Sequence, residues 1–178
     1  MRNISIIAAC DLYGGISKNN TIPWINENVG KIDLKNFQKI TKGYVCVMGV
    51  NTYNEIHDIM VAKRGSESPE LLPGRQSVVI TSNPNRVCYG ASTKPSLRAA
   101  RQSYEFDDYN SPIFVIGGRR LFIEAVAWAE DVYLTIINNN YECDQFFPLN
   151  TISKKFQIAE IDKQDGLTFV HYTRHERS

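Results

Sequence analysis

Hydrophobic residues occur in this chain as short, nearly continuous runs separated by polar or helix-like stretches. Such runs are typical of strands that are buried on both faces of a sheet. Five of them predict buried strands, at Ile4–Cys10 and at residues 44–49, 77–81, 113–117 and 131–137. Because buried strands that alternate with helices pair in parallel, the pattern predicts an α/β fold whose mainly parallel sheet is flanked by helices.

The stretches between these runs predict helices and loops. Helices are expected over a segment that contains Asp33 and ends near Gly43, and over residues 51–59, 96–104 and 119–128. Polar or glycine-rich composition predicts loops at residues 11–22, 62–71 and 105–108, and a type II turn at Leu72-Pro73-Gly74-Arg75. Near the C-terminus, Asp165-Gly166 separates two β-rich runs, at residues 156–161 and 167–173, which predicts an antiparallel hairpin.

Asp33 shares one helical face with large apolar residues. Phe37 follows it by four residues and Ile40 follows Phe37 by three, so the three side chains lie on one side. Ionised carboxylates are normally absent from such a face, which favours a functional group. Alternatively, Asp33 caps the first turn of the helix, where acidic residues are also favoured. This segment alone supports the two interpretations about equally.

The composition is that of an ordinary globular protein. The chain has 178 residues, of which 43% are hydrophobic and 22% charged, and this length suits a single domain with a sizeable core. The formal net charge of +1 gives no reason to expect a nucleic acid or an anionic membrane as a partner. No apolar run is long enough to span a bilayer, and the N-terminus lacks the pattern of a signal peptide. We expect a cytoplasmic monomer.

The four cysteines, Cys10, Cys46, Cys88 and Cys143, are far apart and form no C-x-x-C pair. Two of them lie inside apolar, strand-like runs. This spacing favours buried free thiols in a reducing compartment over a metal site or a disulfide framework.

Two predicted strand-to-helix turns carry glycine, at Gly117-Gly118 and within residues 48–52. Glycine lets a backbone approach a ligand closely, and free N–H groups at a helix start can face a phosphate. Neither turn matches a G-x-G-x-x-G or phosphate-loop motif, and tight turns often contain glycine for packing alone. Together they suggest an extended, multi-anionic ligand such as a dinucleotide. Arg75 and Arg120 are candidate anion contacts, although a solvated surface charge explains either arginine alone.

Several short motifs occur in order along the chain. They are Ile22-Pro23-Trp24, Asp33-Leu34-Lys35-Asn36-Phe37, Val47-Met48-Gly49 with Thr52, Leu72-Pro73-Gly74-Arg75, Val115-Ile116-Gly117-Gly118 with Leu121-Phe122, Tyr133-Leu134-Thr135 and Asp144-Gln145-Phe146-Phe147-Pro148. Together they resemble the dihydrofolate reductase family. The resemblance extends from Ile4 to about Pro148, and the C-terminal hairpin fits the family's fold.

The resemblance implies reduction of 7,8-dihydrofolate to 5,6,7,8-tetrahydrofolate, with hydride transfer from NADPH to pterin C6 and protonation at N5. In the implied catalytic set, Asp33 binds the pterin ring, Thr135 is its partner, and Trp24 closes the pocket through an ordered water. Arg75 is implied to pair with the glutamate carboxylate of the substrate, which suits a guanidinium fork. The implied substrate-binding residues, which also bind antifolates, are Ile7, Ala8, Asp33, Leu34, Phe37, Ile56, Leu72, Arg75, Ile116 and Thr135.

The resemblance also implies an NADPH site and no metal. Residues 16–22 match the mobile flap over the nicotinamide, and residues 44–110 match the lobe that holds the adenosine. Ser82 and Arg120 match groups around the 2′-phosphate, whereas the side chain of Arg119 is expected to face solvent. The implied cofactor-binding residues are Ala9, Ile16, Asn20, Ile22, Gly49, Asn51, Thr52, Thr81, Ser82, Ile116, Gly117, Gly118, Arg119, Arg120, Leu121 and Phe122.

The chain departs from the family pattern at a few positions. Its spacing from Trp24 to the acid and its excursion at residues 57–71 are longer than in the shorter bacterial forms. Ser17 replaces a usual glycine in the flap, Val50 stands where a basic residue is common, and Phe122 replaces a frequent tyrosine. Two other functions are compatible with the fold: a reductase of a riboflavin precursor, which would lack the pairing of Trp24 with Asp33, and a non-catalytic structural or binding relative.

Overall fold

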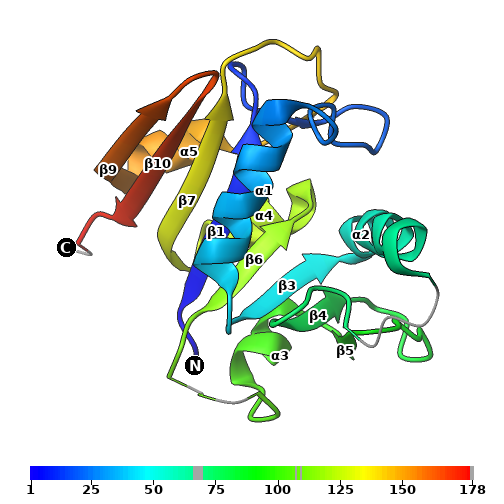
Figure 1. Cartoon of the computed structure of the whole chain (residues 1–178). Helices are drawn as coiled ribbons and strands as arrows, with labels where there is room; N and C mark the ends of the chain where they lie inside the picture. The colour runs from blue at the N-terminus through cyan, green and yellow to red at the C-terminus, as the bar shows by residue number, and fades with distance from the viewer. Residues whose placement is uncertain (66–69, 107, 109, 177–178) are drawn as a thin grey trace.

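A large sheet with helices on both faces forms the body of the protein (Figure 1). The computed structural model describes residues 1–65, 70–106, 108 and 110–176. The strands of this sheet are β1 (Ile4–Cys10), β3 (Val45–Gly49), β4 (Gln76–Ile80), β5 (Ser92–Lys94), β6 (Ile113–Gly117), β7 (Ala129–Ile137), β9 (Phe156–Gln164) and β10 (Leu167–Arg174).

The strands lie in the order β5-β4-β3-β6-β1-β7-β10-β9. Neighbours from β5 to β7 are parallel, whereas β10 is antiparallel to both β7 and β9. This arrangement confirms the predicted fold class, a mainly parallel sheet closed by a C-terminal antiparallel hairpin. Among the described residues, no helix is long and apolar enough to cross a membrane.

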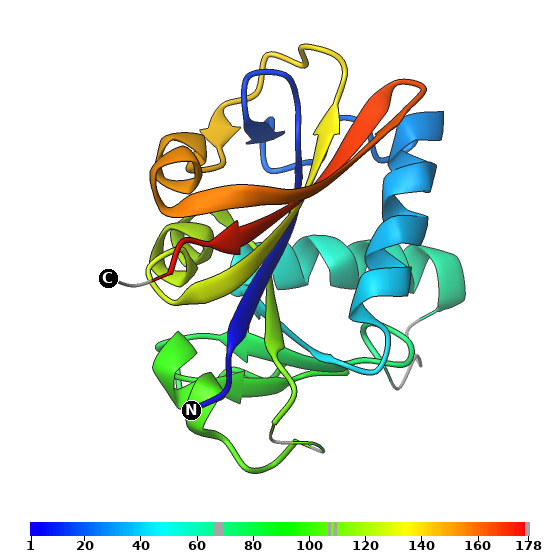
Figure 2. The ribbon, with the colours of Figure 1, turned by 90° about the vertical axis from the view of Figure 1, so that its left-hand side faces the viewer.

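Helices cover the sheet in two layers (Figure 2). One face carries α1 (Asn28–Thr41) and α2 (Val50–Arg64), and the other carries α3 (Leu97–Gln102), α4 (Arg119–Ala125) and α5 (Leu149–Lys155). Strand alternation sorts the side chains of β1 between the two layers. Ile7 packs with residues of α1 and α2, whereas Ala8 packs with the cluster that includes α3, α4 and α5.

Local signals in the sequence set several boundaries as predicted. Helix α1 ends with Lys42 at its C-cap, and Gly43 follows with a left-handed φ of +82°. In the predicted type II turn, the Arg75 amide donates to the Leu72 carbonyl oxygen at 3.1 Å, and Gly74 supplies the positive φ of +75°. The described structure also has the predicted hairpin between β9 and β10.

The prediction that residues 11–22 form only a loop is wrong. This stretch contains β2 (Gly15–Ser17), which pairs antiparallel with β8 (Gln145–Phe146). So short a strand has no periodicity of its own. It forms because a segment more than a hundred positions away supplies its partner, and a local pattern does not contain that information.

The predicted boundary between a short helix and an exposed excursion is also wrong. Helix α2 continues from Val50 to Arg64, since Ala62 and two basic residues suit a last helical turn before Gly65. Leu71, at the end of the expected excursion, is only 3% exposed. Residues 66–69 of that prediction lie outside the described residues.

Other differences concern short elements. Strand β5 and helix α5 were not predicted, and α4 ends at Ala125 rather than at residue 128. Phe106 is buried, although the stretch 105–108 was expected to be solvated, and residue 107 lies outside the described residues. Strand β5 has no buried residue and α5 has only Ile152, so tertiary packing rather than periodicity defines these two elements.

Candidate active site

Asp33 lies in the interior of α1 rather than at its start. The N-cap is Glu27 and the first turn contains no acidic residue, so the interpretation of Asp33 as a helix cap is wrong. The side chain is half-buried, and burial raises the pKa of its carboxyl group above the ordinary value of 3.8. A hydrogen bond from the Thr135 hydroxyl partly offsets this rise by stabilising the ionised form.

Thr135 is held rigidly behind the carboxylate by the centre of the sheet. It is only 3% exposed and lies on β7, between Ala9 of β1 and Phe169 of β10. Because strands on both sides fix its backbone, its hydroxyl presents a fixed donor to Asp33. The fold thus joins two residues of the predicted catalytic set that lie far apart in the sequence.

Trp24 supports the start of α1. It is 2% exposed and packs in a cluster with Ile137 and Leu167, while its ring meets that of Tyr141 at a centroid distance of 5.3 Å. Gly30 lies directly against it: a Cβ there would come within 2.0 Å of the Trp24 carbonyl oxygen. Only glycine therefore permits this approach, which sets the position of the helix that carries Asp33.

An apolar cluster lies between the sheet and helices α1 and α2, on the same face of the sheet as the helix that carries Asp33. We call it the α1/α2 cluster. Five residues of the predicted substrate-binding set belong to it: Ile7, Phe37, Ile56, Leu72 and Ile116. Ala8 packs on the opposite face of the sheet, and Leu34 is 43% exposed beside Asp33 on α1. The fold thus assembles most of the predicted apolar lining from five separate segments.

Arg75 is anchored at the border of the α1/α2 cluster. Its Nε donates to the Pro73 carbonyl oxygen at 3.1 Å and its Nη1 to the Thr41 hydroxyl at 3.3 Å. The guanidinium lies over the Phe37 ring, 5.3 Å from the centroid. Burial lowers the pKa of Arg75. Cys46 opposes this shift by raising the pKa, whereas the positive charge of Arg64 lowers it further. The group is therefore pre-oriented in a partly desolvated place, where a charged hydrogen bond is strong.

Three glycines meet at the carboxyl ends of β3 and β6, as the sequence predicts. Gly117 and Gly118 are joined by a cis peptide bond and lie beside Gly49. A Cβ at Gly117 would stand 3.1 Å from the Thr52 hydroxyl, and one at Gly118 would stand 3.5 Å from it. No side chain caps the start of α2 after Gly49. The bare backbone and uncapped N–H groups fit a pyrophosphate, so this edge suits a dinucleotide.

The remaining residues of the predicted cofactor set differ in exposure. The side chains of Asn51, Ser82, Arg119 and Arg120 are exposed, and Thr81 is half-buried. Among the described residues, neither arginine forms a salt bridge. Leu121 and Phe122 point into the core, where Phe122 packs on Phe147, so their part in the prediction rests on their backbone alone.

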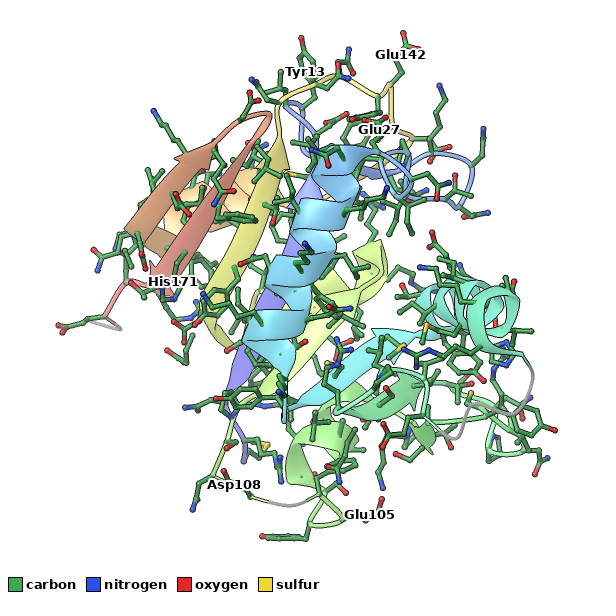
Figure 3. All side chains as sticks on the ribbon, in the orientation of Figure 1. Tyr13, Glu27, Glu105, Asp108, Glu142 and His171 are labelled. Carbon is green, nitrogen blue, oxygen red and sulfur yellow. The ribbon has the colours of Figure 1, made fainter. Side chains whose placement is uncertain are left out.

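The segment from Ile16 to Ile22 lies near the start of α1. Figure 3 shows Tyr13, Glu27 and Glu142 at this same end of the molecule. Ile16 packs against the core, Ile22 packs against the cluster of Trp24, and Asn20 is exposed with a left-handed φ of 60°. The Asn19 amide donates to Asp144 Oδ2 at 2.8 Å.

The structure adds one acid that the sequence analysis missed. Glu55 of α2 accepts a hydrogen bond from the Ile22 amide at 3.1 Å, and burial raises the pKa of its carboxyl group. Glu55 lies one helical turn after Thr52, but its contact with Ile22 crosses 33 positions of sequence, and no local pattern signals it.

The cysteines agree with their prediction as free thiols. Cys10, Cys46 and Cys88 are buried, and Cys143 is partly so. Burial raises the pKa of Cys10 and of Cys46 to about 12, which keeps both thiols protonated and unreactive near neutral pH. The described residues contain no cluster of ligands suited to a metal ion.

Comparisons with known proteins now decide the family, because the dihydrofolate reductase family model matches residues 3–174. The chain belongs to the dihydrofolate reductase family. A dihydrofolate reductase of Staphylococcus aureus strain Mu50 is 29% identical over 180 residues, which cover 96% of this chain and 98% of that protein. Dihydrofolate reductase type 9 of Escherichia coli is also 29% identical, over 90% of this chain and 85% of that one.

A solved structure agrees with the sequence relatives. The dihydrofolate reductase of Enterococcus faecalis, complexed with NADP(H) and RAB-propyl, matches with a TM-score of 0.76 and 25% identity, over 98% of this chain and 97% of that one. The resemblance inferred from the motifs is confirmed. The protein is an NADPH-dependent oxidoreductase that reduces dihydrofolate to tetrahydrofolate.

Proposed function

We propose that Asp33 is the residue around which this dihydrofolate reductase organises its chemistry. The observation that carries the proposal is a carboxyl group whose pKa is raised by burial and which receives the hydroxyl of a buried threonine. Its remaining acceptor sites suit the adjacent N–H donors of a pterin ring. A lone carboxylate beside the α1/α2 cluster would be unfavourable without such a partner.

The reaction joins dihydrofolate, NADPH and one proton to give tetrahydrofolate and NADP⁺. Bound NADPH supplies the hydride that C6 of the pterin accepts. The Asp33 carboxylate holds the pterin ring by accepting hydrogen bonds from the ring's N–H groups. Its negative charge favours protonation at N5, and water delivers the proton. Residues of the α1/α2 cluster exclude bulk water from the ring, which strengthens the carboxylate's electrostatic effect.

Arg75 binds the glutamate tail of the substrate in this proposal. Two of its donors are already bonded, to Pro73 and Thr41, so the guanidinium is fixed before the ligand arrives. A fixed fork loses little conformational entropy when it takes up a carboxylate.

The NADPH site extends from Ile116 across the three glycines to the exposed residues beyond them. The backbone at Gly117, Gly118 and the start of α2 would hold the pyrophosphate, and Ser82 with Arg120 would hold the 2′-phosphate. The adenosine lobe at residues 44–110 corresponds to the sheet edge formed by β3, β4 and β5, with α2 and α3 beside it. The close approach of the three glycines and the uncapped start of α2 support these residue assignments.

The biological setting stays a prediction. We infer a single-domain, monomeric, cytoplasmic protein whose partners are dihydrofolate and antifolates. The length suits one domain, the free cysteines suit a reducing compartment, and the net charge of +1 gives no reason to expect a nucleic acid or a membrane.

The direct test is purified protein with NADPH and dihydrofolate, followed by the loss of nicotinamide absorbance. We expect oxidation of NADPH that depends on dihydrofolate and is abolished by methotrexate. A folded protein without this activity would instead support the non-catalytic alternative. A riboflavin precursor should give no oxidation, because the paired Trp24 and Asp33 segment and the family match favour a pterin.

A further inference from the structure

Glu55 makes a long-range contact that none of the assigned roles uses. Its Oε1 accepts a hydrogen bond from the backbone amide of Ile22 at 3.1 Å, across 33 positions of sequence. Thr52 lies one helical turn before it and faces the glycines, and Ile56 follows it in the α1/α2 cluster. Glu55 is therefore on the part of α2 that borders the site, and it reaches a residue of the predicted cofactor set.

The segment around Ile22 is tied to the protein on its other side by different groups. The Asn19 amide donates to Asp144, the Asp144 amide donates to the Ser17 carbonyl oxygen at 3.0 Å, and Lys18 pairs with Glu142 at 3.8 Å. All of these bonds lead to the chain that follows β7. The bond to Glu55 instead joins Ile22 to α2. The segment is therefore attached on one side to the chain after β7 and on the other side to α2.

The chemistry of this bond suits a specific attachment rather than a surface contact. The bond is partly buried, and burial is the main cause of the raised pKa of Glu55, whereas the Ile22 amide lowers that pKa. Ile22 is followed at once by Pro23 and the buried Trp24, so its backbone is fixed on the C-terminal side. Holding the Ile22 amide consequently fixes the end of the segment nearest the site.

We propose that Glu55 is a positioning residue, which holds residues 18–22 at the glycine edge by accepting the Ile22 amide and thereby helps to retain the cofactor. It acts through Ile22 and touches no reacting atom. The inference rests on the proposed function for its second half only, because the attachment itself is a property of the protein without ligand.

The test compares Glu55→Ala with Glu55→Gln, whose amide oxygen still accepts a hydrogen bond. Asp58→Ala is the matched control, since Asp58 lies on the same helix with a largely exposed side chain. In protein without ligand, hydrogen exchange of the Ile22 amide should be about tenfold faster in Glu55→Ala, and the dissociation constant for NADPH should rise about tenfold. Glu55→Gln should restore most of both properties, and Asp58→Ala should match wild type.

Three outcomes would overturn the proposal. Unchanged exchange at Ile22 in Glu55→Ala would show that the bond does not hold the segment. Faster exchange with unchanged NADPH binding would show that the attachment does not retain the cofactor. Equal damage in Glu55→Gln and Glu55→Ala would show that charge, not acceptance of the amide, matters. Failure of wild-type protein to bind NADPH would instead contradict the proposed function and leave the exchange result intact.

Discussion

Asp33 and Arg120 are both charged, but they lie in regions built in different ways. Asp33 stands on a helix packed against the sheet, receives the hydroxyl of a buried strand residue and has a raised pKa. Arg120 and its neighbour Ser82 are exposed, and among the described residues Arg120 forms no salt bridge. The pterin end of the proposed site is therefore fixed by packing before any ligand binds, whereas the phosphate end depends on charge that water and salt can screen.

The difference has a physical consequence for mutations. At the packed end, a change alters both the chemistry and the stability of the fold, because the same contacts serve both. At the exposed end, a change should alter cofactor selectivity and leave stability nearly untouched. Four substitutions, from the largest expected effect to the smallest, separate these behaviours.

Asp33→Asn should lower turnover at neutral pH by roughly 10²- to 10⁴-fold, since it keeps the shape and removes the ionisable group. The loss should shrink at low pH, where dihydrofolate arrives already protonated. A pH profile of kcat for both proteins measures this. Unchanged activity at neutral pH would contradict the role of Asp33.

The same substitution should raise stability above about pH 4. Burial raises the pKa of Asp33 in the folded state, so its protonated form favours folding and this contribution is lost as pH rises above the ordinary value of 3.8. Asparagine cannot ionise and avoids that loss. Thermal melts should show a higher Tm for the variant at pH 7 than for wild type, by about 2–4 °C for each kcal/mol regained, and a smaller gap at pH 4.

Arg75→Leu should raise KM for dihydrofolate far more than it lowers kcat. A charged hydrogen bond is worth ~1.5–3 kcal/mol, so roughly a ten- to hundredfold rise is expected. A pterin without the glutamate tail should bind equally well to both proteins. The exposed side chain of Arg98 on α3 offers a control, and Arg98→Leu should leave KM nearly unchanged. Equal losses with both substrates would identify Arg75 as a structural residue.

Gly30→Ala should destabilise the fold by about 1–3 kcal/mol, although alanine normally favours a helix interior over glycine. The added Cβ would meet the Trp24 carbonyl oxygen at 2.0 Å, so α1 must shift and take Asp33 with it. The free energy of unfolding, measured by chemical denaturation, and kcat/KM should therefore decline together. Lys35→Ala, at an exposed position of the same helix, is the control. A stable, fully active Gly30→Ala variant would show that α1 can move without harm to the site.

Arg120→Ala should change stability least and reduce the preference for NADPH over NADH by about tenfold. The wild-type preference should itself be smaller by ~1.5–3 kcal/mol than in relatives with a basic residue at the position of Val50, and should weaken as salt rises. Measuring kcat/KM with both cofactors in both proteins, at two salt concentrations, decides it, with Arg119→Ala as the neighbouring control. If the preference survives, the phosphate is held elsewhere, for example by Lys63 or Arg64.

Much of this architecture could be predicted because short, local stretches of the sequence determine it. The buried strands are continuous apolar runs, the end of α1 is marked by Lys42 and Gly43, and the turn before Arg75 requires its glycine. The motif order then allowed the family resemblance, which the comparisons confirm. Short-range sterics and periodicity act within a few residues, so a linear sequence displays them directly.

The family resemblance already favoured a functional Asp33, but only the tertiary structure showed its surroundings, since neither the contact with Thr135 nor the depth of burial can be read from residues 31–41. The pairing of β2 with β8, the contact of Gly30 with Trp24 and the bond from Ile22 to Glu55 were likewise invisible beforehand. Each joins segments through one specific contact across space. Local residue preferences do not encode which distant partner will arrive, because that is settled only when the whole core packs at once.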